Sequence, residues 1–293
     1  MKAIVAQDAV AKKKKSQLAS IFKRLRKNKL AVFGLITLFI LVVLAVFAPY
    51  IAPYPYDQQN LEDKLAKPGS KYLLGADNFG RDILSRLIYG SRISLIVGFI
   101  SVGISLSIGG TLGAISAFYG GKLDIIIMRF CDVLQSVPQT ILAIAVSAAL
   151  GSGVFYTMLA IGIASVPRFA RVCRAAVLTN KEQEYVEACY SIGASNKRII
   201  MMHIIPNSLA PIIVQATSRI ASAIIAAASL SFVGLGVQPP TPEWGSMLSA
   251  GRAYVVSYPH MVISPGLSIV LTVFSLNMLG DGLRDALDPR LKN

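Results

Sequence analysis

Few residues in this 293-residue chain have the types and spacing that catalysis or metal binding requires. The two histidines, His203 and His260, are far apart, and Cys131, Cys173 and Cys189 show neither metal-site nor disulfide spacing. We find no paired carboxylates and no nucleophile beside a base. We therefore expect no catalytic residue, no metal site and no cofactor, and we expect that the chain is not an enzyme.

The polar segment 173–206 carries a pattern that indicates a protein contact instead. Thr179, with an acidic residue three positions later, predicts a capping box at the start of a helix. Gly193 can adopt the left-handed conformation that ends such a helix. Ser195 can cap a second helix, which we expect to run until Pro206. The segment therefore reads as helix, turn, helix.

The first of these helices has an apolar stripe on an otherwise charged surface. Tyr185, Val186, Cys189 and Ile192 recur at spacings of three to four residues or lie beside one another, as on one helix face. An apolar stripe outside the membrane must pack against something. The candidates are the chain's own helix bundle, the lipid headgroups, or a groove in a partner protein.

Long uncharged runs surround this segment and point to a membrane protein. The chain is 54% hydrophobic and 15% charged, against about 25% charged for soluble domains. Since about 20 apolar residues are needed to cross a bilayer, the runs predict six spanning helices, with five as the alternative count. We place them at about 30–50, 93–118, 124–149, 154–172, 208–236 and 260–280.

The net charge of +14 is concentrated before the first span. Residues 1–29 contain ten Lys and Arg and a single acidic residue, Asp8. A basic cluster beside a first span indicates a cytoplasmic N-terminus and contact with anionic lipid, and it argues against nucleic acid as the partner. With six spans, the C-terminus also returns to the cytoplasm.

The segment 173–206 also resembles the EAA motif of ABC importer permeases. That motif reads Glu-Ala-Ala, three residues, Gly, nine residues, then Ile-x-Leu-Pro. The chain meets its spacing with Glu187, Ala188, Cys189, Gly193, Ile205 and Pro206. Three departures are mild: Cys189 stands for Ala, His203 for Ile and Ile205 for Leu.

Three further segments narrow the resemblance. Residues 73–92, 238–245 and 280–290 resemble the corresponding parts of dipeptide, oligopeptide and nickel permeases. The similarity extends from about residue 20 to the C-terminus. It is closest to the second, or "C", permease subunit of dipeptide transporters.

This resemblance implies an all-α integral membrane protein with the type I ABC importer permease fold, in the cytoplasmic (inner) membrane. It implies four partners: a second homologous permease in a heterodimer, two ATP-binding subunits at the segment 173–206, and an extracytoplasmic substrate-binding protein. Because the chain has no Gly-x-x-x-x-Gly-Lys-Ser/Thr loop, ATP must be hydrolysed by those separate subunits. The family's cargo would be di- or oligopeptides, with Glu187 and the apolar stripe docking on an ATPase.

The resemblance also divides the chain into four parts. We expect a basic cytoplasmic segment at 1–29, the first span with an extracytoplasmic loop at 30–91, and a cytoplasmic tail at 282–293. Between them, residues 92–281 would form the ABC transmembrane type-1 domain, with five helices and the coupling loop 173–206.

The fifth predicted span contains a charge, Arg219, about ten residues from its start. A charge there costs about 2.5 kcal/mol or more on insertion scales. Arg219 could extend towards the inner interface or pair with a neighbouring helix. Alternatively, it could face a translocation path lined by small residues such as Ser222 and Ser229, where it would meet a peptide carboxylate.

Two other functions stay open from the sequence. The same architecture could import nickel or another small solute, since nickel can travel as a chelate. An ion-coupled secondary transporter is the alternative of another class. Such transporters often contain inverted repeats with broken helices, and no such repeat is visible here.

Overall fold

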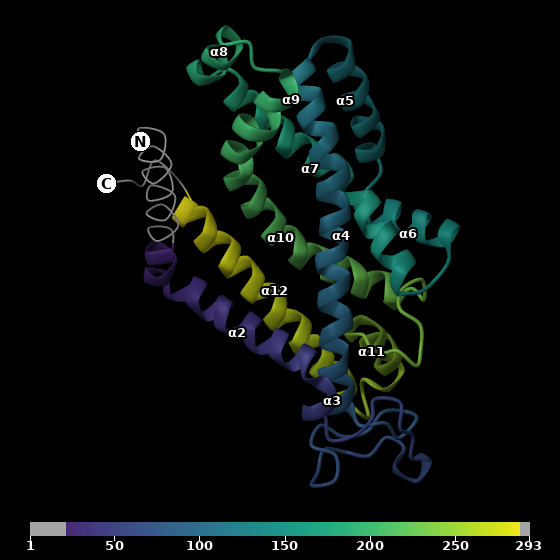
Figure 1. Ribbon diagram of the computed structural model, residues 1–293. Helices are drawn as coiled ribbons and strands as arrows, with labels where there is room; N and C mark the ends of the chain where they lie inside the picture. Colours follow the sequence, from purple (N-terminus) through teal and green to yellow (C-terminus); the bar gives the residue numbers. More distant parts are fainter. Residues whose placement is uncertain (1–21, 288–293) are drawn as a thin grey trace.

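The structure, a computed structural model, describes residues 22–287, and this part is built from helices joined by loops. The predicted basic residues 1–21 and tail residues 288–293 lie outside it. The helices are α2 (Lys29–Val46), α3 (Ala48–Ile51), η1 (Leu61–Asp63), α4 (Ile83–Tyr119), α5 (Gly121–Ser136), α6 (Gln139–Leu150), α7 (Val154–Lys181), α8 (Glu184–Ser191), α9 (Asn196–Arg198), η2 (Ile199–Ile204), α10 (Ile205–Phe232), α11 (Trp244–Gly251), η3 (Arg252–Tyr254) and α12 (His260–Leu287) (Figure 1).

Four helical segments within residues 22–287 are long and apolar enough to cross a membrane: α2, α4, the continuous run Asn196–Phe232 and α12. The pair α5 and α6 adds a fifth if it counts as one bent span. The predicted fourth span corresponds to α7, a helix of 28 residues whose C-terminal half carries several basic side chains. The expected count of six therefore requires α7 to cross as well, and it stays a prediction.

The long helices α4 and α7 lie side by side because α4 presents glycines to its neighbour. A Cβ atom at Gly109 would lie 2.5 Å from the Val166 carbonyl oxygen, and one at Gly113 would lie 2.2 Å from that of Ala170. Only glycine permits so close an approach of the two backbones. The small residues of the second predicted span therefore serve helix packing, as expected for membrane helices.

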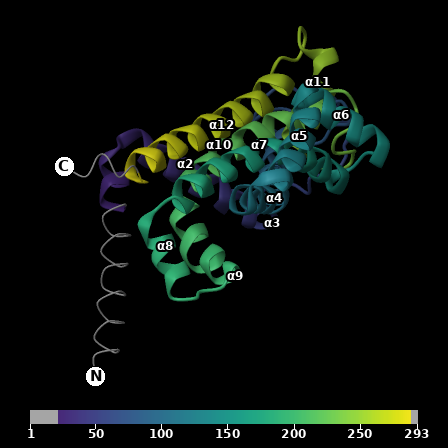
Figure 2. The ribbon, with the colours of Figure 1, turned by 90° about the horizontal axis from the view of Figure 1, so that it is seen from above.

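A second pair, α2 and α12, packs along the other side of the bundle, and α10 lies between α12 and the α4–α7 pair (Figures 1 and 2). The main core gathers side chains from all of these helices. Its largest buried members include Ile161, Phe169, Ile224, Leu230, Trp244 and Leu276. Between membrane helices such side chains stabilise the bundle by close packing, because lipid tails are as apolar as leucine.

Two helix limits differ from those of the predicted spans. Helix α4 begins at Ile83 and not near residue 93, because the Asp82 carboxylate caps it by accepting a hydrogen bond from Ser85 N at 2.7 Å. The boundary expected between residues 91 and 92 therefore falls inside a helix. The predicted third span is broken at Val137 and Pro138, where α5 and α6 meet at 90°. The proline disfavours helical geometry at the residue before it.

Candidate functional site

The hairpin α8–α9, with Gly193 at its turn, occupies one end of the molecule (Figure 1). It lies far from α11 and from residues 52–82, which join α3 to α4 and which we call the long loop. Gly193 has φ = 75°, as predicted. Its N–H donates to Tyr190 O at 2.9 Å, and Ala194 N donates to Cys189 O at 3.0 Å. These bonds satisfy the last carbonyls of α8 in the manner of a left-handed helix cap. We call residues 182–204 the coupling segment.

The apolar stripe of α8 divides between two surroundings. Val186 and Cys189 are buried in an apolar cluster. The cluster also contains Phe118 at the end of α4 and Ile199 and Ile204 of η2. This part of the apolar stripe therefore packs on the chain's own helix bundle, which is one of the three candidates that the sequence allowed. The fourth stripe residue differs, since Ile192 is 82% exposed at the turn.

The EAA-like residues thus fall into a buried and an exposed group. Glu187 and Ala188 point outward on the surface of α8, whereas Cys189 is buried beneath them. Beyond the turn, Ile205 and Pro206 begin α10. Only the outward group is free to contact another molecule.

Two local predictions for this segment are wrong. Thr179 does not begin a helix, because α7 continues to Lys181 and the N-cap of α8 is Gln183. Pro206 does not end one, because the helical run continues from Asn196 to Phe232. The six residues of η2 before it form a widened π-helical turn, a local adjustment that lets a helix pass an irregularity. Ser195 is the N-cap residue of α9, but no hydrogen bond from its side chain satisfies the cap.

Tyr185 Oη of α8 donates to Asn180 Oδ1 at 3.4 Å, and two further contacts join this end of α7 to α4 and α10. Lys181 Nζ donates to Phe118 O at 2.7 Å, at the end of α4. Asn180 Nδ2 donates to Ser208 Oγ at 3.0 Å, across α7 and α10. A displacement of α8 would therefore be felt by α4, α7 and α10 together.

Two ion pairs tie α5 to α7 near this end. Arg174 holds Asp124 in a bidentate pair, with N–O distances of 2.7 and 2.6 Å. Arg171 contacts Asp132 at 2.5 Å. Arg129 and Asp132 of α5 also form a pair at 3.9 Å, but Asp132 has its shorter contact with α7. These residues line a cleft of about 690 Å³.

The three residues predicted for a translocation path share one uncovered side of α10. Ser222 and Ser229 are exposed, and Arg219 is half-buried. With the Gln215 amide oxygen turned towards the guanidinium, Arg219 Nε donates to it at 2.7 Å. The opposite side of α10 is buried, as the small residues Ala223 and Ala227 show. The structure thus brings the three predicted residues onto one face but shows no acidic partner for Arg219 within residues 22–287.

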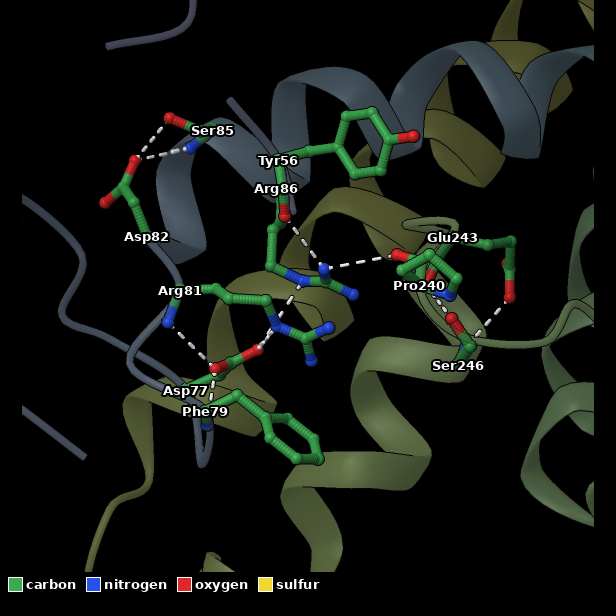
Figure 3. Close-up of polar contacts among 10 residues, drawn as sticks. All are labelled: Tyr56, Asp77, Phe79, Arg81, Asp82, Ser85, Arg86, Pro240, Glu243 and Ser246. Atoms are coloured by element: carbon green, nitrogen blue, oxygen red, sulfur yellow. Dashed lines mark hydrogen bonds and ion pairs between the residues drawn. The ribbon is translucent and has the colours of Figure 1, made fainter. Parts of the chain in front are cut away.

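At the other end of the molecule, buried charges gather in segments for which the sequence pattern predicts no site (Figure 3). Asp77 accepts hydrogen bonds from Phe79 N at 2.8 Å, Arg81 N at 3.0 Å and Arg81 Nε at 2.7 Å. Its ion pair with Arg86 measures 3.6 Å. Arg86 Nη1 donates to Tyr56 O at 3.0 Å and to Pro240 O at 3.4 Å.

Glu243 completes this network and is only 1% exposed. Its carboxylate caps α11 by accepting from Gly245 N and Ser246 N, both at 2.8 Å. It also accepts from Ser94 Oγ of α4 and Ser231 Oγ of α10, at 3.3 and 2.9 Å. We call Asp77, Arg81, Arg86, Glu243 and their partners the loop cluster. Since both arginines contact Asp77 and the Glu243 carboxylate accepts four hydrogen bonds, the loop cluster is built for rigidity.

Nothing in these two regions resembles a reaction centre. Cys131, Cys173 and Cys189 are free and buried. Within residues 22–287, no three His, Cys, Asp or Glu side chains come together as metal ligands would.

Two family models match this chain. Residues 109–293 match the family described as "Binding-protein-dependent transport system inner membrane component". Residues 16–68 match the "N-terminal TM domain of oligopeptide transport permease C".

Curated relatives match nearly the whole chain. The dipeptide transport system permease protein DppC of Alkalihalophilus pseudofirmus is 47% identical over 272 residues, covering 93% of this chain and 90% of the relative. The di/tripeptide transport system permease protein DppC of Pseudomonas aeruginosa is 45% identical, with 95% and 94% covered. The glutathione transport system permease protein GsiD of Escherichia coli O157:H7 is 46% identical, with 92% and 90% covered.

Among solved structures, an inward-facing form of the MetNI methionine ABC transporter is similar, with a TM-score of 0.58. It is 19% identical, and the match covers 69% of this chain and 96% of that chain. At this identity the similarity concerns the fold, which is that of a type I importer permease.

Proposed function

Because the chain belongs to the binding-protein-dependent transport system inner membrane components, we propose that it imports di- or oligopeptides as one half of a permease heterodimer. It is a permease subunit of a peptide ABC importer, since relatives named for dipeptide, di/tripeptide and glutathione transport match it almost from end to end. These relatives are transport subunits and not enzymes. The observation that carries the proposal is their identity of 45–47% together with the hairpin at the end of the bundle.

ATP-binding subunits would dock on the coupling segment. Its outward surface offers Glu187, Ala188 and the 82% exposed Ile192, while Val186 and Cys189 hold the helix to the bundle. Such an arrangement suits mechanical coupling, because the outward face of α8 would bind the ATPase and the inward face would transmit its movement to the helix bundle. Closure of the ATPases would then bias the bundle between outward- and inward-facing states, which requires different contacts in the two states.

The same placement supports the expected orientation. The start of α2 and the end of α12 lie towards the end that carries α8, opposite the long loop (Figure 1). Ala286 and Leu25 pack together there. With the basic residues before α2 in the cytoplasm, both termini and the coupling segment would be cytoplasmic. The loop cluster would then face the substrate-binding protein outside.

The uncovered side of α10 would face the transport path that this chain shares with the second permease. Arg219, Ser222 and Ser229 lie on it. A charged side chain within a span is costly against lipid and is found facing water or a partner. This supports the alternative in which the three residues line the path.

Uptake measurements test the proposal. Cells that lack this chain should lose ATP-dependent uptake of a labelled dipeptide and regain it with the unaltered chain. Ile192→Asp should insert in the membrane but restore little uptake, because a charge at the exposed turn opposes an apolar contact with the ATPase. Ile192→Val is the matched control and should restore uptake. Loss of nickel uptake with peptide uptake intact would contradict the peptide assignment, and full uptake by Ile192→Asp would contradict the docking surface.

A further inference from the structure

The uncovered side of α10 is more polar than contact with lipid would allow. Gln215, Ser218, Arg219, Ser222 and Ser229 follow one another at spacings of one to seven residues on that side, and all are exposed or half-buried. The buried side of the same helix is apolar. In a membrane helix, polar residues face the bundle interior or a water-filled cavity. The polar side of α10 therefore marks an aqueous surface.

A cavity of about 610 Å³ continues this surface towards the cytoplasmic end. It lies between α7, α10 and α12, and Val172, Ala176, Gln215, Ser218 and Asp281 are among the residues that line it. Val172 and Ala176 are four residues apart on one face of α7. The cavity thus joins one face of α7 to the polar side of α10.

Two arginines extend the lining of this cavity by one helical turn. Arg168 lies four residues before Val172, and Arg219 lies four residues after Gln215. Residues four apart share a helix face, so both arginines lie one turn beyond the residues that line the cavity, on the same faces of α7 and α10. The register of α7 against α10 brings the two positions together, because Asn180 contacts Ser208 and, further along, Val172 and Gln215 line the same cavity.

Neither arginine has an acidic partner within the described residues, whereas their neighbours do. Arg171 and Arg174, the next basic residues along α7, pair with Asp132 and Asp124. For residues 22–287, no carboxylate lies within 4.0 Å of the Arg168 or Arg219 guanidinium. Two uncompensated like charges close together repel one another, and a bound anion would relieve their repulsion.

We propose that Arg168 and Arg219 form a subsite for the carboxylate of the transported peptide. This inference rests on the proposed function. A guanidinium group binds a carboxylate through paired N–H donors, and every unmodified peptide has a C-terminal carboxylate. Gln215 fixes the orientation of Arg219 through Nε, which leaves other donors of its five free for a ligand.

Charge-selective labelling tests the subsite. The complete transporter, with its partner subunits, is placed in nanodiscs without nucleotide or binding protein, and this chain carries Ser222→Cys. The rates of modification by an anionic and a cationic methanethiosulfonate of similar size are compared, after subtraction of the reaction of the unaltered chain. The anionic reagent should react faster, and Arg168→Gln with Arg219→Gln should lower the ratio of rates about tenfold. Arg129→Gln, an exposed arginine on α5, should leave the ratio unchanged.

Protection by peptide identifies the ligand. A dipeptide should slow the modification of Ser222→Cys, and the same dipeptide with an amidated C-terminus should not. Equal rates for the two reagents, or no reaction with either because a partner subunit covers the face, would overturn the subsite. Equal protection by both peptides would overturn the carboxylate as its ligand. Peptide uptake by the unaltered transporter with ATP and binding protein is measured in parallel, so its absence would identify a failure of the proposed function instead.

Discussion

The two ends of the molecule stabilise their loops in opposite ways. In the loop cluster, the charged side chains are buried and their partners come from segments far apart in the sequence, including Tyr56, Pro240 and Ser94. In the coupling segment, the charged side chains point outward, and a left-handed glycine and a small apolar cluster hold the turn.

The difference shows how rigidity is distributed along the transporter. A network of buried charges has one satisfied arrangement, and removing one member leaves others unpaired. An apolar cluster under an exposed helix tolerates small displacements better, because its contacts are non-directional. The loop cluster therefore fixes the helices where α4, α10 and α11 meet, and the coupling segment is the end suited to movement.

Loss of Arg86 should give the largest effect. Arg86→Met leaves Asp77 with one basic partner and removes the bonds to Tyr56 O and Pro240 O. Breaking a buried ion pair costs about 3–5 kcal/mol of the free energy of unfolding. The control is Arg92→Met, an exposed arginine on the same helix. Thermal unfolding of the two variants in detergent checks this, and equal midpoints would mean that the loop cluster is not the rigid end.

Glu243→Gln should have the next largest effect. The carboxylate accepts four hydrogen bonds, and the amide NH₂ cannot accept those that face it. An unsatisfied buried donor costs about 1–3 kcal/mol. Glu187→Gln is the matched change at the coupling segment, where the side chain is exposed, and it should leave the unfolding midpoint almost unchanged. A larger shift for Glu187→Gln would reverse the comparison.

Two glycines sharpen the contrast with a smaller change in stability. Gly193 and Gly234 have φ values of 75° and 81°, and a Cβ atom at either would meet nothing within 4 Å. A leucine at either position should therefore cost about 1 kcal/mol of backbone strain. Gly193→Leu should nevertheless insert and abolish peptide uptake, whereas Gly234→Leu, at the opposite end, should retain it. Normal peptide uptake by Gly193→Leu would contradict a role of this turn in coupling.

The smallest expected effect concerns pH in the long loop. Lys71 donates to Asp63, and this bond lowers the pKa of the Asp63 carboxyl below its ordinary value of 3.8. Because the folded loop favours the ionised form, its stabilisation is present at neutral pH and is lost as the pH falls below about 4. Pepsin cleavage of the loop should therefore accelerate on acidification, and less so in Asp63→Asn. An identical acceleration in both would show that another group controls the loop.

Local signals in the sequence predicted local features well. Gly193 has the left-handed conformation that its position indicated, and the burial of Val186 and Cys189 followed from their spacing. The helix breaks at Gly120 and at Gly151 to Gly153 also lie in the gaps between the predicted spans 93–118, 124–149 and 154–172. Each of these features depends on neighbours within a turn or two of the chain.

Features that depend on distant partners were missed. The start of α4 was placed too late because Arg86 and Arg92 argue against a buried helix, and only the fold reveals that Asp77 and two carbonyls compensate Arg86. Glu243 was noted only as part of a family segment, since its partners lie in α4 and α10. The helix was expected to end at Pro206, but it continues past this residue because the π-helical turn before it accommodates the proline. The spacing of apolar residues does not predict such a turn.

The right-angled junction of α5 and α6 has a consequence for the surrounding lipid. At 1.5 Å per residue, their 16 and 12 residues extend about 24 and 18 Å. Neither reaches across a hydrocarbon core of about 30 Å. Joined at a right angle, the pair extends less far than a straight helix of the same length, so a thinner bilayer or a neighbouring subunit in place of lipid would suit this junction, and such hydrophobic mismatch favours association.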